Sequence, residues 1–379
     1  MDYDQYITQM REIQSHVILF LDDENEDQQD LINFFKDINI SEKRNIMYEF
    51  LCLLSKISKN HHRYPSFFDK IEHILEHFKN DIISLFSNID LFKIFKRSNR
   101  LLLYLIKNSF MTLDDSLANQ IITNDPAKNH FFYPEIEQFL FPEQLKAIKS
   151  MGIECNSDYY AKRKIGENDS KICTLIRDDL VEEFITYVHS VNYPLDSLIS
   201  GSIYETNTLL QTNKDSISLI EYATFFGAIQ IIKYLQMNGI ELTPSLWIYA
   251  IHSNNADLIH YLEDNHVKPN DPTFGECLRT AIKCHHNDIA NYFQNNILFD
   301  NKELGEKTVL NGFRYFNYEF LPSSPDKEYV SVCIRYNYLE IVEFLLKNKI
   351  IDLNERAKTF ETDPRVILIF LFIITPCYV

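Results

Sequence analysis

Glycine, tryptophan and positive charge are scarce in this 379-residue chain, which has 8 Gly, 1 Trp and 37 Lys plus Arg against 54 Asp plus Glu. Phosphate-cradling loops need glycine because the backbone must approach the ligand closely. The sequence contains no Walker loop, no dinucleotide fingerprint and no Gly-x-Ser-x-Gly elbow. We therefore expect a non-enzymatic protein, with no catalytic residue, no metal and no cofactor.

The formal net charge of -17 predicts a surface that repels phosphate backbones and anionic lipid headgroups. Nucleic-acid binding and stable membrane insertion are accordingly not expected. The acidic start, residues 1–4, lacks the basic residues of a secretory signal, so we expect a cytoplasmic location, with the nucleus possible. Seven scattered cysteines show no paired framework and are typical of reduced thiols packed as small hydrophobic groups.

The chain does contain one short sequence motif, the repeat line, which occurs at least four times. Each copy starts with a small or polar residue and ends in an aromatic followed by a large apolar residue, which is the buried stripe of a short helix. The copies are 227–235, 256–262, 287–293 and 337–346. Eleven positions before each aromatic lies a small residue in a second apolar stretch: Ala223, Ala250, Ala281 and Cys333. Two linked helices per repeat predict an all-α helical-hairpin solenoid.

A further copy at 176–188 places the start of this array near 166. The spacing of the aromatics indicates two insertions, near 190–215 and 297–325, which a solenoid accommodates as loops on one face. The second insertion carries a group of aromatics that either packs onto the array or is displayed for a partner: Phe313, Tyr315, Phe316, Tyr318 and Phe320.

Residues 1–165 predict a helical N-terminal domain, followed by divergent repeats at 166–360 and an apolar tail at 361–379. Within the first domain, 94–105 matches 251–262 when moved by 157 positions, which suggests degenerate hairpins. The nine apolar residues 366–374 are too few for a membrane span of about 20 residues. We expect this tail to cap the last hairpin, because the end of an array exposes apolar surface.

The repeat resembles the ankyrin repeat. Residues 218–223 stand for its Thr-Pro-Leu-His-x-Ala opening, 227–239 for the second helix with its glycine cap, and 337–354 for the later half of a repeat. A helical N-terminal region before aromatic-rich, degenerate repeats is similar to the large ankyrin families of parasitic protists, whose leading domain is of unknown function. The other repeats lack the Thr-Pro-Leu-His opening, and Asn265, His266 and Asn296 stand where glycines are expected.

The alternative function is a zinc-dependent hydrolase. Residues 73–77 read His-x-x-Glu-His, so that His73 and His77 lie one helical turn apart and Glu76 is available to activate water. An ordinary solvated helix face is the competing interpretation. A second group, Cys277, Cys284, His285 and His286, spreads over about 10 Å of helical rise between its cysteines, too far to share one zinc ion. It is interpreted as core cysteines and surface histidines.

The favoured function is a protein-protein interaction module or scaffold. In ankyrin arrays the residues that end the first helix of each repeat point into the concave groove, and this resemblance implies eight partner-binding residues: Phe225, Phe226, His252, Ser253, Lys283, Cys284, Arg335 and Tyr336. Alternatively, Phe225 and Phe226 fill the core, as large apolar residues usually do. The partner is expected to be a protein, and its identity is not contained in the sequence.

Overall fold

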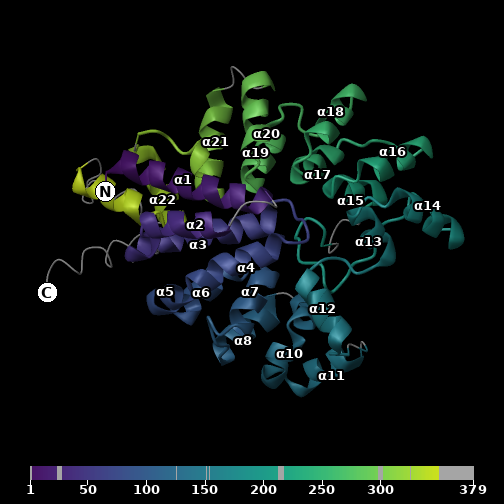
Figure 1. Ribbon diagram of the computed structural model, residues 1–379, viewed down its shortest axis with the longest axis horizontal. Helices are drawn as coiled ribbons and strands as arrows, with labels where there is room; N and C mark the ends of the chain where they lie inside the picture. The colour runs from purple at the N-terminus through teal and green to yellow at the C-terminus, as the bar shows by residue number, and fades with distance from the viewer. Residues whose placement is uncertain are drawn as a thin grey trace. The chain divides into compact units, whose positions relative to one another are not determined.

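The computed structural model describes residues 2–349, apart from 24–27, 125, 151, 153, 212–216, 298–301 and 325. Within these residues the regular elements are helices (Figure 1). One isolated antiparallel bridge joins Leu198 and Ser218. The all-α prediction is confirmed for this part of the chain. No described helix combines the length and the apolar character that crossing a membrane requires. The predicted tail at 361–379, including 366–374, lies outside the described residues.

The chain packs as two compact units. Unit 1 combines Met1–Leu53 with Asn301–Val379, and unit 2 comprises Leu54–Asp300. The predicted division at 165 follows the repeat pattern and not this packing, so it stays a prediction. One consequence is clear for the last copy of the repeat line, at 337–346. It belongs to unit 1, whereas the copies between 176 and 293 belong to unit 2.

Unit 1 is built from helices taken from both parts of the sequence. Among its described residues, α1 packs against α2, η4 and α23, and α22 packs against α21 and α23. Helix α3 begins in this unit and continues past Leu53 into unit 2. The elements are α1 (Tyr3–Asp22), α2 (Gln28–Asp37), η1 (Ile40–Glu42), α3 (Arg44–Asn60), α21 (Lys302–Tyr315), η4 (Tyr318–Phe320), η5 (Lys327–Tyr329), α22 (Val330–Tyr336) and α23 (Leu339–Lys347).

Polar side chains of α1 hold the segment around η4. Gln14 donates to Asn317 Oδ1 over 2.9 Å and accepts from the backbone N–H of Tyr318 over 2.7 Å. Arg11 donates to the carbonyls of Tyr318 and Leu321. These contacts explain the second predicted insertion, whose aromatics are packed inside unit 1 and not displayed: Phe313, Tyr315, Phe316, Tyr318 and Phe320 are each at most 8% exposed.

Unit 2 is a longer run of short helices. The elements are α4 (Phe67–His77), α5 (Lys79–Leu85), α6 (Asn88–Phe95), α7 (Asn99–Lys107), α8 (Asp115–Asn124), α9 (Pro126–Phe131), α10 (Tyr133–Ile136), η2 (Glu137–Phe139), α11 (Pro142–Ser150), α12 (Ser157–Ile165), α13 (Lys171–Arg177), α14 (Val181–Ser190), α15 (Leu219–Phe225), α16 (Ile229–Met237), α17 (Leu246–His252), α18 (Ala256–Asp264), α19 (Gly275–Cys284), α20 (Asn287–Tyr292) and the π-helix η3 (Phe293–Ile297).

Within unit 2 the helices from α13 to α20 pack in a regular order (Figure 1). Each first helix contacts the next one along, so that α13 packs on α15, α15 on α17 and α17 on α19. Each also packs on its own second helix, as α15 does on α16 and α19 on α20. The earlier pair α6 and α7 packs together as well, and α7 begins and ends 157 residues before α18, which matches the offset seen in the sequence.

Local sequence signals fix where these helices start and stop. Ser218 and Glu221 form a reciprocal capping box, in which each side chain accepts from the other residue's backbone N–H, and α15 begins there. Gly227 then takes a left-handed φ of 70° between α15 and α16, a conformation that costs little only for glycine. The helical reading of 218–235 is confirmed.

The alanines of the repeat lie where first helices meet. Ala223, Ala250 and Ala281 are fully buried, as the pattern predicts. The repeat tyrosines at 234, 261 and 292 are substantially buried, as predicted, although each keeps a minor part of its surface exposed. The hydroxyls of Tyr261 and Tyr292 reach acceptors near the surface. Tyr292, for example, donates to Glu263 over 2.7 Å.

Replacing Ala250 by Leu is expected to destabilise the protein by about 1–3 kcal/mol. The added carbons must fit between α17 and its neighbours α15 and α19, where Ala250 has no exposed surface. Urea unfolding measures the effect. Ala256→Leu is the matched control, since Ala256 is exposed at the start of α18. Equal stability of the two variants would show that α17 has room for a larger side chain.

Candidate functional site

Three histidines meet inside unit 2. His61 and His62 lie in the segment between α3 and α4, and His286 is the N-cap of α20. One ligand nitrogen from each ring lies within 4.8 Å of the others. His61 has no exposed surface, His286 is 3% exposed and His62 is partly exposed. Residues 224 positions apart in the sequence are thereby brought together.

Backbone carbonyls set the protonation of two of these rings. His61 Nδ1 is 2.7 Å from the carbonyl of Cys284, and His286 Nδ1 is 2.7 Å from the carbonyl of Ile251. A carbonyl only accepts, so Nδ1 carries the proton in both rings and the neutral ring has its lone pair on Nε2. Burial, reinforced by the nearby His61 and His62, holds the pKa of His286 well below its usual value, which keeps this ring neutral.

A cysteine and a further histidine pack beside this cluster, but their chemistry is not that of a nucleophile. Cys284 Sγ lies 3.3 Å from His252 Nδ1. Burial raises the pKa of the Cys284 thiol to about 12, while burial, followed by the charge of Lys283, holds the pKa of His252 well below 6.5. A catalytic pair needs a thiolate, and these shifts favour a neutral thiol beside a neutral imidazole.

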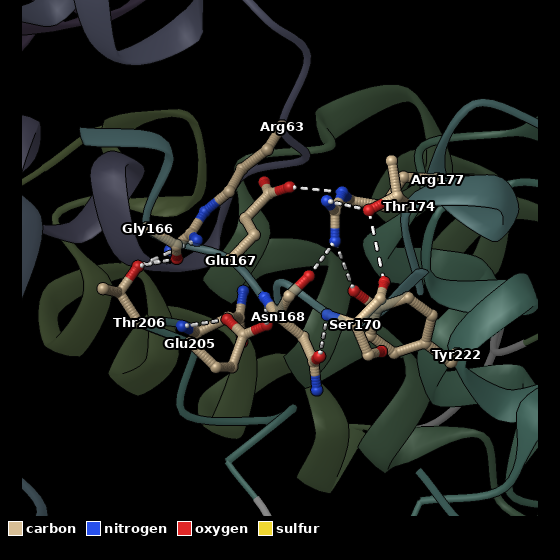
Figure 2. A network of polar contacts seen from close by, with 11 residues as sticks. Arg63, Gly166, Glu167, Asn168, Ser170, Thr174, Arg177, Glu205, Thr206 and Tyr222 are labelled. Carbon is tan, nitrogen blue, oxygen red and sulfur yellow. Dashed lines mark hydrogen bonds and ion pairs between the residues drawn. The ribbon is translucent and has the colours of Figure 1, made fainter. Parts of the chain in front are cut away.

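The next residue of the same segment, Arg63, enters a network of polar contacts (Figure 2). Its Nη1 donates to Thr206 Oγ1 over 3.1 Å, and Thr206 in turn donates to the carbonyl of Gly166 over 2.7 Å. Glu205, only 4% exposed, accepts from the backbone N–H groups of Asn168 and Asn207. Residues 200–206 of the first predicted insertion, near 190–215, are therefore held against residues 166–169.

Arg177 forms the second half of the network. Figure 2 shows its guanidinium between Glu167, Asn168 and Tyr222. The guanidinium lies 2.9 Å from Glu167 Oε2 and donates to the Asn168 carbonyl over 2.6 Å. Burial raises the pKa of Glu205 to about 7, opposed by the positive charge of Arg63. The network brings buried acids and arginines together, with Arg177 and Glu167 in direct contact, an arrangement typical of a structural contact between loops.

The segment from Asn60 to Arg63 is thus fixed along its length. The backbone of Asn60 hydrogen-bonds His252, His61 bonds the end of α19, and Arg63 bonds the loop at 206. This segment covers the ends of α17 and α19, where the ankyrin resemblance places part of the concave groove. The physical reason is simple: a turn rich in histidine and arginine offers hydrogen-bond donors to the carbonyls at helix C-termini.

The predicted partner-binding residues are not alike in the structure. Phe225, His252 and Cys284 are at most 3% exposed, so they have almost no surface to offer a partner in this arrangement. Phe225 packs against the ring of His252, which fits the alternative that it fills the core. The remaining five keep some exposed surface: Phe226, Ser253, Lys283 and Tyr336 are partly exposed and Arg335 is exposed. The first three of these belong to unit 2 and the last two to unit 1.

The His-x-x-Glu-His motif lies on the outside of α4. His73, Glu76 and His77 are exposed, and Glu76 accepts from Tyr104 over 3.1 Å and from Lys79 over 3.3 Å. Among the described residues, the single group of three potential metal ligands is His61, His62 and His286. The described residues therefore supply no third metal ligand beside His73 and His77 for the hydrolase alternative.

The group at 277–286 requires a correction. Cys277 and Cys284 are buried, as predicted, but His285 and His286 are buried as well and are not surface histidines. They follow α19 in a turn, with His285 at a left-handed φ of 60°, and this turn directs them inward. No sequence motif singles out His61 and His62. Their adjacency was visible in the sequence, but their proximity to His286 was not.

No protein-family model, curated protein or solved structure matches this sequence. The ankyrin likeness therefore rests on the residues of this chain alone.

Proposed function

We propose that the chain is a non-enzymatic protein-interaction module, in which the hairpins from α13 to α20 form an ankyrin-like solenoid. The observation that supports this proposal is the serial packing of α13, α15, α17 and α19, each with its own second helix. In such an array the core is set by the repeated apolar residues, while the residues at the turns vary without cost to the fold. Those turns then present a surface whose chemistry is available for recognition.

The surface that we favour for the partner lies outside these hairpins, at the end of α22 in unit 1, where the repeat line occurs once more. Arg335 is exposed there, and Tyr336 beside it is partly exposed. Arginine and tyrosine dominate binding energy at many interfaces, because each combines a large apolar area with hydrogen-bonding groups. Phe226, Ser253 and Lys283 in unit 2 are the second choice. The aromatic group at 313–320 is no longer a candidate, since its side chains are buried in unit 1.

Substituting Arg335 and Tyr336 by alanine is expected to weaken partner binding by about 1–2 kcal/mol each. The partner is first isolated with the full-length chain, and its affinity for each variant is then measured by titration calorimetry. Lys347→Ala is the matched control, because Lys347 is a strongly exposed residue on the neighbouring helix α23. A folded double variant that binds the partner with unchanged affinity would contradict the α22 surface.

A further inference from the structure

The histidine cluster gathers three imidazole rings, the ligand type that zinc commonly takes. Its three ligand nitrogens lie within 4.8 Å of one another. His62 Nδ1 and His286 Nε2 lie 3.3 Å apart, within hydrogen-bonding distance. In a tetrahedral site with zinc–nitrogen bonds of about 2.0–2.1 Å, the ligand nitrogens are separated by about 3.4 Å. One pair already has this separation.

The hydrogen bonds around the cluster are those of an outer ligand shell. A histidine that binds a metal through one nitrogen commonly donates its other N–H to a backbone carbonyl, which fixes the ring and its tautomer. His61 and His286 both meet this condition through Nδ1, at 2.7 Å from the carbonyls of Cys284 and Ile251. Both carbonyls belong to the ends of first helices, so the orientation of the two rings is set by α17 and α19.

We propose that His61, His62 and His286 together bind one divalent transition-metal ion of the zinc type. Neutral imidazoles suit zinc and its neighbours, whereas calcium and magnesium prefer oxygen ligands. His62 is partly exposed, which gives the ion a path from solvent and leaves a coordination position for water. The ion ties the segment before α4 to the turn between α19 and α20, and so reinforces contacts between residues 224 positions apart.

The rings need only a small movement to reach a shared ion. Their centroids are 4.4 Å apart for His61 and His62, 4.8 Å for His61 and His286, and 5.3 Å for His62 and His286. His62 is the ring with room to adjust, because it is the one that is partly exposed. The two buried rings are held by their carbonyls, so the site is largely organised before the ion arrives.

The test is a titration of chelator-treated, full-length protein with Zn²⁺, with Mg²⁺ as the comparison ion. We expect saturation at one Zn²⁺ per chain and a thermal midpoint that rises with Zn²⁺ concentration, because the ion binds the folded state. Backbone amide exchange should slow at residues 60–64 and 285–290. Absence of saturable Zn²⁺ binding, or an equal effect of Mg²⁺, would overturn the proposal.

The decisive variants are His62→Gln and His286→Gln. Removing hydrogen-bond partners of metal ligands costs about 10–100-fold in affinity, so loss of a ligand itself is expected to cost at least that much. His62→Gln carries the test if His286→Gln does not fold, since His62 is the less buried. The control is the double variant His73→Gln, His77→Gln. In the wild type these two exposed rings lie one turn apart on α4 and offer another place for Zn²⁺ to bind, which the control removes. Loss of binding in this control, with retention in His62→Gln, would move the site to α4 and refute the cluster.

Discussion

Glu49→Gln is expected to remove a large part of the pH dependence of stability between about pH 4.5 and pH 8. Glu49 has no exposed surface in unit 1, and its Oε2 accepts hydrogen bonds from Tyr6 and Tyr318. Its other oxygen, Oε1, is buried without a hydrogen-bond partner among the described residues. Burial raises the pKa of this carboxyl from 4.5 to about 8, although the two tyrosine hydroxyls lower it.

The sign of the effect follows from proton binding. Because the folded-state pKa lies above the unfolded value, the folded protein holds more protons between pH 4.5 and about 8. The contribution of Glu49 to the free energy of unfolding is therefore fully present below pH 4.5, and it is lost as the pH rises through the folded-state pKa. A shift of this size corresponds to a loss on the order of 5 kcal/mol. Glutamine cannot ionise, so the variant does not undergo this loss.

Urea unfolding of both proteins at a series of pH values measures this difference. At pH 5 the variant should be equal to the wild type or slightly less stable, because its amide N–H₂ has no acceptor at the Oε1 position. At pH 8.5 the variant should be the more stable of the two. The comparison isolates Glu49 from other titrating groups, including Glu205, which both proteins share. A constant difference across the series would show that Glu49 is ionised in the folded protein.

Glu135→Gln is expected to destabilise unit 2 by about 3–5 kcal/mol. Arg163 on α12 has no exposed surface, and its Nη2 donates to Glu135 Oε2 on α10 over 2.6 Å. Phe131 and Tyr159 pack their rings on the guanidinium, with the Arg163 Cζ 5.4 and 5.1 Å from the ring centroids. Removing the carboxylate leaves a buried positive charge without its counter-charge, which costs far more than the pair contributes.

The double variant Glu135→Gln, Arg163→Met is the control for this prediction. It removes the buried charge while methionine fills much of the same volume between the aromatic rings, so most of the lost stability should return. Urea unfolding at pH 7 compares the wild type, both single variants and the double variant. If the double variant is as unstable as the sum of the single variants, the loss comes from packing and not from the uncompensated charge.

Local features of this protein were predictable because they depend on residues close in sequence. The alanines at 223, 250 and 281 mark the close approach of first helices and are fully buried. The capping box at Ser218 and Glu221 starts α15, and a glycine at 227 provides the left-handed turn that follows it. Periodicity also places the repeat tyrosines on the inward face of their helices, but it does not report which acceptor a tyrosine hydroxyl reaches.

What the sequence determined by itself was the all-α class, the helical pairs of the repeat and the small residues between them, since helix formation and capping act over three or four positions. Only the tertiary structure decided that the turn at 60–63 covers the ends of α17 and α19, that His61 and His62 meet His286, and that the aromatics at 313–320 lie inside unit 1. These contacts join segments far apart in the chain. No local sequence pattern encodes these contacts. They form only after the helices have packed and have brought distant segments within hydrogen-bonding or van der Waals distance.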